Sequence, residues 1–283
     1  MKLIADHVTY EYEKDTEHSV RAVDDVSFVV NPGEMIAIIG HTGSGKSSLV
    51  QTLNGLIKPD SGTVYYDGMD IFEKGFDRKA MRGKVGLVFQ YPEHQLFEET
   101  AFKDVCFGPK NMGVSRKETE LRAYEALKMV GLEDDYFYQS PFDMSGGQRR
   151  RVAIAGVLAM KPEVLILDEP TAGLDPQGRR EIFELIKKLK TKENIAVIIV
   201  SHSMEDVSEH ADRLLVMNKG RLCFDDVPRE VFKHYAELEE MGLQAPKVRY
   251  ILEKMAAIMP GINKDVITLN EAAEEIVGAF KNR

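Results

Sequence analysis

The chain has 283 residues, 43% of them hydrophobic and 29% charged, and a formal net charge of -9 at pH 7. This composition is ordinary for a globular protein with a sizeable core, and the acidic balance disfavours a protein that grips nucleic-acid backbone. The two cysteines, Cys106 and Cys223, show no disulfide or zinc spacing, which predicts a reducing compartment.

The N-terminal half opens with strands. Residues 3–12 and 20–30 are rich in β-branched and aromatic side chains, and Asp6 and His7 come too early for a secretory signal. After a turn at 31–34, the apolar run 35–40 predicts a buried strand that leads into a glycine-rich stretch and a helix beginning near Lys46.

The middle of the chain alternates between strands and helices. Short strands are expected over 62–90, and a helical pattern extends from about 98 to 160. Buried strands follow at 164–170 and 195–202, with a helix at about 176–190 between them. This alternation predicts an α/β fold with a mostly parallel sheet, into which the helical block is inserted. Apolar runs such as 195–200 are far shorter than the roughly 18–20 residues that span a bilayer, so any membrane role requires a partner.

Beyond about residue 225 two amphipathic helices are expected. One apolar face comprises Val248, Ile251, Leu252, Met255 and Met259, and the other comprises Leu269, Ala272, Ala273, Ile276, Val277 and Phe280. These helices either cover the chain's own sheet or form a dimerisation surface, and the residues alone leave both open.

The stretch "GHTGSGKS", Gly40 to Ser47, matches a complete phosphate-binding loop between a strand and a helix. Its glycines let backbone N–H groups point at a phosphate, and the helix N-terminus favours the negative charge. Lys46 is expected to reach the β and γ phosphates and Ser47 to hold Mg²⁺. The loop therefore predicts nucleotide binding.

The strand ending in "LDE" supplies an acidic pair. Asp168 is placed to coordinate Mg²⁺, and Glu169 is placed to polarise the water that attacks the γ-phosphate. Gln90 ends the strand "VGLVFQ", where it can approach both the metal ion and that water. Glu169 favours hydrolysis over binding alone.

A second phosphate element stands at "SGGQ", residues 145–148. Ser145, Gly146 and Gly147 offer a hydroxyl and unhindered N–H groups at the start of a helix, an arrangement suited to an anion. One chain with a complete phosphate loop does not need another for the same nucleotide.

Taken in order with "LDEP", "GLD" at 173–175 and His202, these motifs resemble the ATP-binding cassette (ABC) proteins over roughly residues 1–225. The resemblance implies a P-loop NTPase fold with a RecA-like sheet, an N-terminal antiparallel β subdomain and a helical subdomain inserted at about 91–160. Residues 226–283 are then a helical C-terminal extension.

The resemblance also implies roles for individual residues. Two cassettes pack head to tail, so that each "SGGQ" covers the γ-phosphate held by the other chain. Glu169, His202 and Gln90 match catalytic positions, with His202 at the γ-phosphate, and Ser47, Gln90 and Asp168 match the metal site. The expected nucleotide contacts are Tyr12, Gly40, His41, Thr42, Gly43, Ser44, Gly45, Lys46, Ser47, Ser48, Asp168, Ser145, Gly146, Gly147, Gln148 and Asp175. Tyr12 matches the aromatic residue that stacks on adenine, with Tyr10 as the alternative, and Met144 replaces the usual leucine.

Residues 88–113, together with "SPFDMSGGQ" and "IGHTGSGKS", are similar to the ATPase subunits of energy-coupling factor transporters, and most similar to the second of their two paralogous ATPases. The resemblance implies ATP and Mg²⁺ as cofactors and a peripheral position on the cytoplasmic face of the cell membrane. It implies a paralogous ATPase or a second copy, a transmembrane coupling subunit and a substrate-binding membrane subunit as partners, for import of vitamins or transition-metal ions. Leu96 and Phe97 are either anchors for a partner or part of the chain's own helical block.

Two other functions remain open. A soluble cassette protein acting on nucleic acid or the ribosome is disfavoured by the single cassette, the negative charge and the lack of a long insertion. A regulatory ATP-binding module without turnover is disfavoured by Glu169. The residues do not identify a transported substrate.

Overall fold

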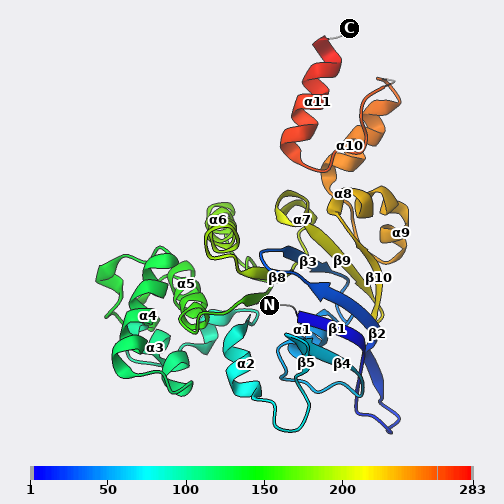
Figure 1. Ribbon diagram of the computed structural model, residues 1–283. Helices are drawn as coiled ribbons and strands as arrows, with labels where there is room; N and C mark the ends of the chain where they lie inside the picture. Colours follow the sequence, from blue (N-terminus) through cyan, green and yellow to red (C-terminus); the bar gives the residue numbers. More distant parts are fainter. Residues whose placement is uncertain (1–2, 260, 282–283) are drawn as a thin grey trace.

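The computed structural model describes residues 3–259 and 261–281, which build two sheets (Figure 1). An antiparallel sheet has the order β2-β1-β4-β5, with β1 Leu3–Tyr12, β2 Val20–Val30, β4 Ser61–Tyr66 and β5 Met69–Asp70. A second sheet has the order β10-β9-β3-β8-β7-β6, with β3 Met35–Ile39, β6 Val85–Val88, β7 Val164–Asp168, β8 Ala196–Val200, β9 Arg213–Asn218 and β10 Arg221–Asp226. All neighbours in the second sheet are parallel except β9 and β10, which confirms the predicted α/β fold.

The helices surround this second sheet. They are α1 Lys46–Leu53, α2 Arg78–Lys84, α3 Ala101–Asn111, α4 Arg116–Met129, α5 Gly146–Leu158, α6 Pro176–Glu193, α7 Met204–His210, α8 Pro228–Val231, α9 Tyr235–Glu240, α10 Lys247–Ala256 and α11 Leu269–Lys281. Short 3₁₀ turns are η1 Pro92–Gln95, η2 Asp134–Tyr136, η3 Pro141–Asp143 and η4 Phe232–His234. Figure 1 shows α3, α4 and α5 gathered beside the sheet as a separate helical block, between β6 and β7 in the chain.

One local expectation was wrong. Residues 62–90 were expected to form only short strands, but α2 occupies Arg78–Lys84. Asp77 caps this helix by accepting a hydrogen bond from the N–H of Ala80, and Met81 is its buried apolar contact. A helix of this length has too few periodic apolar residues to be recognised by pattern, so its cap is the more informative signal.

The segment after residue 225 divides into two parts. Val231, Phe232 and Leu238 are buried in the same apolar cluster as Ile39 and Val216 of the sheet. The α8–α9 part therefore covers the chain's own sheet. The two sequence alternatives concern the later helices, α10 and α11, and the choice between them stays a prediction.

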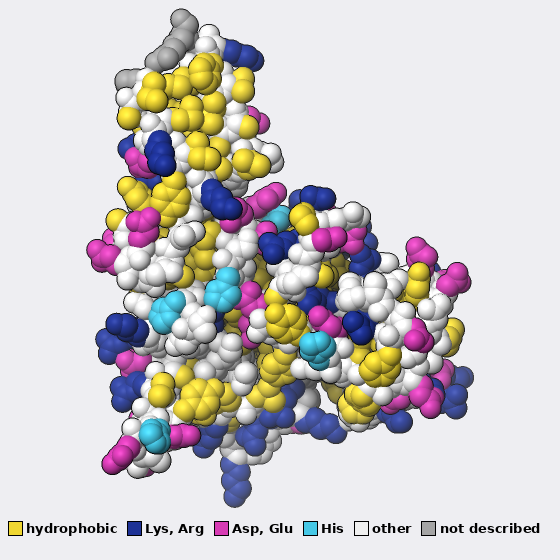
Figure 2. Space-filling model, turned by 180° about the vertical axis from the view of Figure 1, so that it is seen from behind, with side chains coloured by type: hydrophobic (Ala, Val, Ile, Leu, Met, Phe, Trp, Pro, Cys, Tyr) yellow, Lys and Arg dark blue, Asp and Glu magenta, His cyan; other side chains and the backbone are white. Residues whose placement is uncertain are grey.

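The α10–α11 part projects beyond α8 and α9 (Figure 1) and has a small apolar cluster of its own, with Leu252 and Val266 at its centre. Several large apolar side chains remain exposed there, and Figure 2 shows hydrophobic side chains gathered over this end. The exposed set is Ile251, Ile258, Leu269, Val277 and Phe280.

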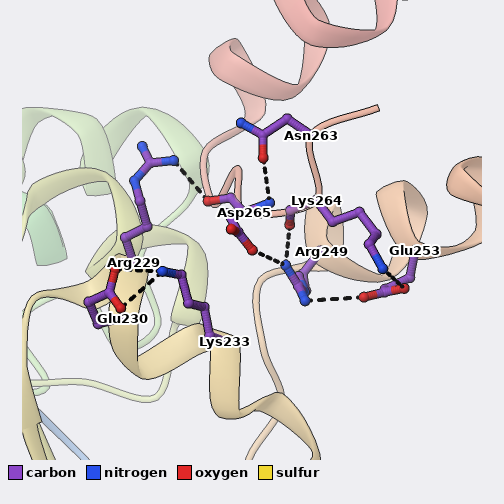
Figure 3. Close-up of polar contacts among 8 residues, drawn as sticks. All are labelled: Arg229, Glu230, Lys233, Arg249, Glu253, Asn263, Lys264 and Asp265. Atoms are coloured by element: carbon purple, nitrogen blue, oxygen red, sulfur yellow. Dashed lines mark hydrogen bonds and ion pairs between the residues drawn. The ribbon is translucent and has the colours of Figure 1, made fainter. Parts of the chain in front are cut away.

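A polar network fastens the projecting helices (Figure 3). Arg249 on α10 is buried and donates to Asp265 Oδ1 at 3.1 Å, to the carbonyl oxygen of Lys264, and to Glu253 Oε1 at 3.1 Å. Arg229 on α8 donates to the carbonyl oxygen of Asp265 at 2.8 Å. Asp265 thus connects α10 to α8, and so the projecting helices to the part that covers the sheet.

Arg249→Met is expected to loosen this attachment. The substitution leaves Asp265 and Glu253 without their buried partner, so the opening free energy of α10 is expected to fall by about 2–4 kcal/mol. Amide hydrogen exchange of residues 247–281 measures it, with β3 as an internal reference. Lys233→Met, which removes an exposed ion pair with Glu230, is the matched control and is expected to change exchange by less than about 0.5 kcal/mol. Unchanged protection of α10 in Arg249→Met would show that the network does not hold the extension.

Candidate nucleotide site

Strand register gathers the predicted site at one edge of the parallel sheet. Val200 of β8 pairs with Ile38 of β3 on one side and with Asp168 of β7 on the other. The three strands therefore end at the same level, and the segments that leave them emerge together. These segments are the phosphate loop, the acidic pair and the turn that carries His202.

The phosphate loop has glycine where no side chain fits. A Cβ on Gly40 would lie 2.4 Å from the carbonyl oxygen of Met217, and one on Gly45 would lie 1.9 Å from that of Ala22. Gly45 also has a φ of 101°, a conformation that favours glycine, and it immediately precedes α1. Close packing against two neighbouring strands therefore fixes the loop in front of the helix N-terminus.

Lys46 lies folded over this loop. Its side chain is buried, and Nζ donates to the carbonyl oxygens of Gly40 at 2.7 Å and His41 at 3.0 Å. Burial lowers the pKa of this ammonium, and the charges of Glu169 and Asp168 oppose the shift. A phosphate oxygen is a stronger acceptor than either carbonyl, so the lysine is placed to exchange its loop contacts for an anion.

Asp168 and Ser47 are in direct contact. Ser47 Oγ donates to Asp168 Oδ2 at 3.1 Å, and Asp168 is 8% exposed. Burial raises the pKa of Asp168, with the Ser47 hydrogen bond and the Lys46 charge opposing it. A hydroxyl and a carboxylate at this distance fit a hard cation such as Mg²⁺.

Among the described residues, Asp168 does not belong to a larger cluster of metal-binding side chains. Within residues 3–259 and 261–281, no group of three or more His, Cys, Asp or Glu side chains is arranged to hold a metal ion. Magnesium sites of this kind complete their coordination with substrate phosphates and water, which suits one carboxylate and one hydroxyl beside a phosphate loop.

Glu169 combines an uncommon backbone conformation with a buried carboxylate oxygen. Its φ is 50°, in the left-handed region that non-glycine residues rarely adopt. Its Oε1 is buried without a hydrogen-bond partner in the described part of the chain, although His202 Nε2 lies 3.1 Å away. Burial, reinforced by the Asp168 charge, raises the pKa of Glu169 to about 7. A poorly solvated carboxylate with a raised pKa is a stronger base than an exposed one.

His202 and Gln90 border this centre. The His202 side chain is 52% exposed, and burial of the remainder, together with the Lys46 charge, lowers its pKa. Gln90 is exposed and follows β6, whose Val88 pairs with Leu167 next to Asp168. Gln90 thus leaves the sheet at the same edge as the acidic pair.

The two candidate tyrosines differ in their surroundings. Tyr12 is 42% exposed, and its hydroxyl lies 3.1 Å from Ser48 Oγ in α1. Tyr10 packs against the core and meets the Tyr12 ring edge to face, with centroids 4.8 Å apart. Exposure beside the first turn of α1 leaves Tyr12, rather than Tyr10, free to stack on a base.

The "SGGQ" element starts α5 in a different place. Ser145 and Gln148 form a reciprocal capping box, with Ser145 Oγ accepting from the Gln148 N–H and Gln148 Oε1 from the Ser145 N–H. A Cβ on Gly146 or Gly147 would meet no atom within 4 Å among the described residues. The chain's own packing therefore does not require two glycines in this first turn, and glycine is a poor helix former.

Residues 145–148 line an open groove of about 880 Å³ together with Tyr91, Gly173 and Asp175. Asp175 is exposed and caps α6 by accepting from the N–H of Gly178 at 2.7 Å. None of the described residues that line this groove comes from 40–48. The two phosphate elements of the chain thus face different spaces.

Sequence reasoning missed one buried contact beside this groove. Arg150 and Glu93 form an ion pair that is almost fully buried, with side chains 3% and 11% exposed. Arg150 shares a helix face with Ile154 and Leu158, both buried. A charged residue within an apolar stripe was the available signal, because such a residue needs a buried partner.

The two candidate partner anchors differ. Leu96 is buried in the cluster of the helical block, whereas Phe97 is 56% exposed and meets the Phe107 ring edge to face. Leu96 therefore belongs to the chain's own core, and Phe97 is available to a partner.

Comparison with known proteins places the chain in a family. A profile described as ABC transporter matches residues 23–172. The energy-coupling factor transporter ATP-binding protein EcfA2 of Clostridium acetobutylicum is 50% identical over 283 residues, covering 100% of this chain and 99% of the relative. Its counterpart in Caldanaerobacter subterraneus is 48% identical over 277 residues, covering 98% and 97%. The chain belongs to the energy-coupling factor transporter ATP-binding proteins.

Solved structures of similar fold support this family. The cbiO1 protein of Clostridium perfringens, part of the ABC transporter complex cbiONQ, aligns with a TM-score of 0.75 at 36% identity, covering 91% of this chain and 98% of that one. The cassette MJ0796, in a dimeric post-hydrolysis state bound to ADP and Pi, aligns with a TM-score of 0.71 at 31% identity, covering 80% and 98%. The chain is an ATP-hydrolysing ABC ATPase, and a soluble protein acting on nucleic acid or the ribosome is not favoured.

Among the described residues, none of the helices has the length and apolar content needed to cross a bilayer.

The state of Glu169 predicts a pH effect on stability in the absence of nucleotide and magnesium. Its pKa is about 7 in the folded chain against an ordinary 4.5, so the folded state holds a proton that the unfolded state has lost between these values. Below pH 4.5 Glu169 is protonated in both states and does not destabilise the fold. As the pH rises from 4.5 to 7, the free energy of unfolding falls by up to about 1.4 kcal/mol per pH unit.

Glu169→Gln removes this dependence, since the amide does not ionise. The variant is expected to be about 2–3 kcal/mol more stable than the wild type at pH 8 and nearly equal to it at pH 4.5. Urea unfolding at both pH values measures the difference, with Glu240→Gln as an exposed control. An equal offset at the two pH values would contradict the raised pKa.

Proposed function

We propose that the chain works in a head-to-tail dimer of cassettes in which each nucleotide is held between the phosphate loop of one chain and the "SGGQ" element of the other. The single observation that carries this is the open first turn of α5. A side chain on Gly146 or Gly147 would meet no other atom within 4 Å among the described residues, and both glycines line a groove to which no residue of 40–48 contributes. The positive end of α5 is thus available to a phosphate that another chain supplies.

Within this dimer each side chain has a defined task. Lys46 and the α1 N-terminus bind the phosphates, and Tyr12 stacks on the base. Ser47 and Asp168, with Gln90, hold Mg²⁺, which when bound neutralises charge on the β and γ phosphates. Glu169 orients the attacking water and accepts its proton, and His202 contacts the γ-phosphate. Asp175, exposed in the groove beside Ser145, lies where the two sites communicate.

The transport role rests on family membership and on surfaces of this chain. The partners are a paralogous ATPase, a transmembrane coupling subunit and a substrate-binding membrane subunit, at the cytoplasmic face of the cell membrane. Closure of the dimer drives uptake of vitamins or transition-metal ions. Phe97 and Phe107 give the helical block an exposed aromatic pair for a membrane partner, and the exposed apolar side chains of α10–α11 offer contact to the second cassette.

Two substitutions separate a shared site from a self-contained one. Lys46→Ala disables the site of its own chain, and Ser145→Ala disables the site of the partner chain by about a hundredfold. In a mixed dimer of a Lys46→Ala copy and a Ser145→Ala copy, one site carries both changes and the other carries neither. The mixed dimer is therefore expected to recover ATP hydrolysis that both single-variant dimers lack.

The assay is steady-state phosphate release from dimers of two differently tagged copies. Binding of ATP to the isolated Ser145→Ala chain is the control and is expected to match the wild type, since its phosphate loop is intact. Where the working dimer contains a paralogue instead, each substitution is expected to leave one site active. A mixed dimer as inactive as its parents, together with loss of ATP binding by Ser145→Ala, would show a self-contained site.

A further inference from the structure

Arg150 lies at the meeting point of three segments. Its Nε and Nη2 donate to the two carboxylate oxygens of Glu93 at 3.1 and 2.8 Å. Its Nη1 donates to the carbonyl oxygens of Pro170 at 3.1 Å and Ala172 at 2.8 Å. One guanidinium on α5 therefore holds η1 and the loop after β7 at the same time.

Stability alone does not explain this arrangement. Arg150 is 2% exposed and shares its helix face with Ile154 and Leu158, so an apolar side chain of similar length would suit the packing. Replacing a buried ion pair by apolar residues is often neutral or stabilising, because both charges must be taken out of water. Burial raises the pKa of Glu93, but the hydrogen bonds and the charge of Arg150, together with a backbone hydrogen bond, lower it by more, so the net shift is downward and favours the ionised carboxylate.

The segments that meet at Arg150 carry the reactive groups of the site. Glu93 lies in η1, three residues after Gln90, and Tyr91 between them has a φ of 52°. Pro170 directly follows Glu169, whose φ is 50°. Tyr91 and Gly173, one from each loop, also line the same groove. Left-handed conformations at Tyr91 and Glu169 persist only where the surroundings hold them.

The geometry requires arginine in particular. Four hydrogen bonds run from one planar group to a carboxylate in one direction and to two carbonyls in another. A lysine ammonium is a single point with three donors, so it keeps the charge but cannot hold the carboxylate as a fork while meeting both carbonyls. Arg150→Lys therefore separates the bridging geometry from the charge.

We propose that Arg150 is a positioning residue that joins the start of α5, the loop after Gln90 and the loop after Glu169 into one unit. Ser145 and the glycines at the start of α5 serve the partner's nucleotide, whereas Gln90 and Glu169 serve the chain's own. Arg150 thereby couples the two nucleotide sites through the interior of a single chain. This inference rests on the shared-site dimer proposed above.

The test uses a dimer of one substituted copy of this chain and an unsubstituted second cassette. ATP turnover is measured with only one of the two nucleotide sites active. Ser145→Ala in the substituted copy leaves only that copy's own site active, and Lys46→Ala leaves only the opposite site active. Arg150→Lys is then added to each background. Turnover is expected to fall roughly tenfold in both, since small displacements of reacting groups carry costs of this size. The Kd of the isolated chain for ATP is expected to stay within about twofold, because the phosphate loop is untouched.

Arg151→Lys is the matched control, since Arg151 neighbours Arg150 on α5 but pairs with Glu181 on α6. It is expected to change turnover less than about twofold in either background. Glu93→Gln removes the negative charge that pairs with Arg150, and it replaces Arg150→Lys as the test if that variant does not fold. It is expected to slow both sites as well, and the double variant is expected to be no slower than the slower single one.

Each other pattern overturns the proposal. Slowing only in the Lys46→Ala background would show that Arg150 acts on the start of α5 alone. Slowing only in the Ser145→Ala background would show that it acts on the two loops alone, and no slowing in either would show a packing role. The shared-site dimer fails separately, if Ser145→Ala without any change at Arg150 removes turnover at both sites or at neither.

Discussion

The constraint on which the proposed mechanism depends is that the two phosphate-binding elements of one chain, at the starts of α1 and α5, face different spaces. Lys46, the loop glycines and the start of α1 meet at the end of the parallel sheet, next to Asp168 and Glu169. The second donor set, at the start of α5, faces a groove that no residue of 40–48 enters. In the proposed dimer each nucleotide meets both elements, one from each chain.

The surroundings of Glu169 suit the role of base that we propose for this residue. The backbone of Glu169 is in a left-handed conformation, its Oε1 has no hydrogen-bond partner in the described residues, and burial raises its pKa. A surface glutamate has none of these properties and is a weak base. The structure can hold this unfavourable state because the loop that follows is fixed by carbonyl contacts to Arg150 and because β7 is buried between two parallel neighbours.

The phosphate loop and the acidic pair could be predicted from the sequence. Gly40–Ser47, Asp168 and Glu169 could be placed because strand ends in a parallel sheet meet at one edge, and the contact of Ser47 with Asp168 follows from that rule. The sequence did not predict α2, whose main signal is its N-cap Asp77. It also did not predict that the C-terminal segment divides into α8–α9, which packs on the sheet, and α10–α11, which has an apolar cluster of its own. It also missed Arg150 with Glu93, because a pair separated by 57 positions is created by tertiary packing alone.

The most direct test of the whole account is to purify the tagged chain from gently solubilised membranes of its own host and to identify what accompanies it. The account predicts a second cassette, a multi-span membrane protein and one or more small membrane proteins that capture substrate, retained in stoichiometric amounts through a second purification step. Recovery of ribosomes, of nucleic acid or of the chain by itself would contradict the transport assignment, while the assignment of the chain as an ABC ATPase would stand.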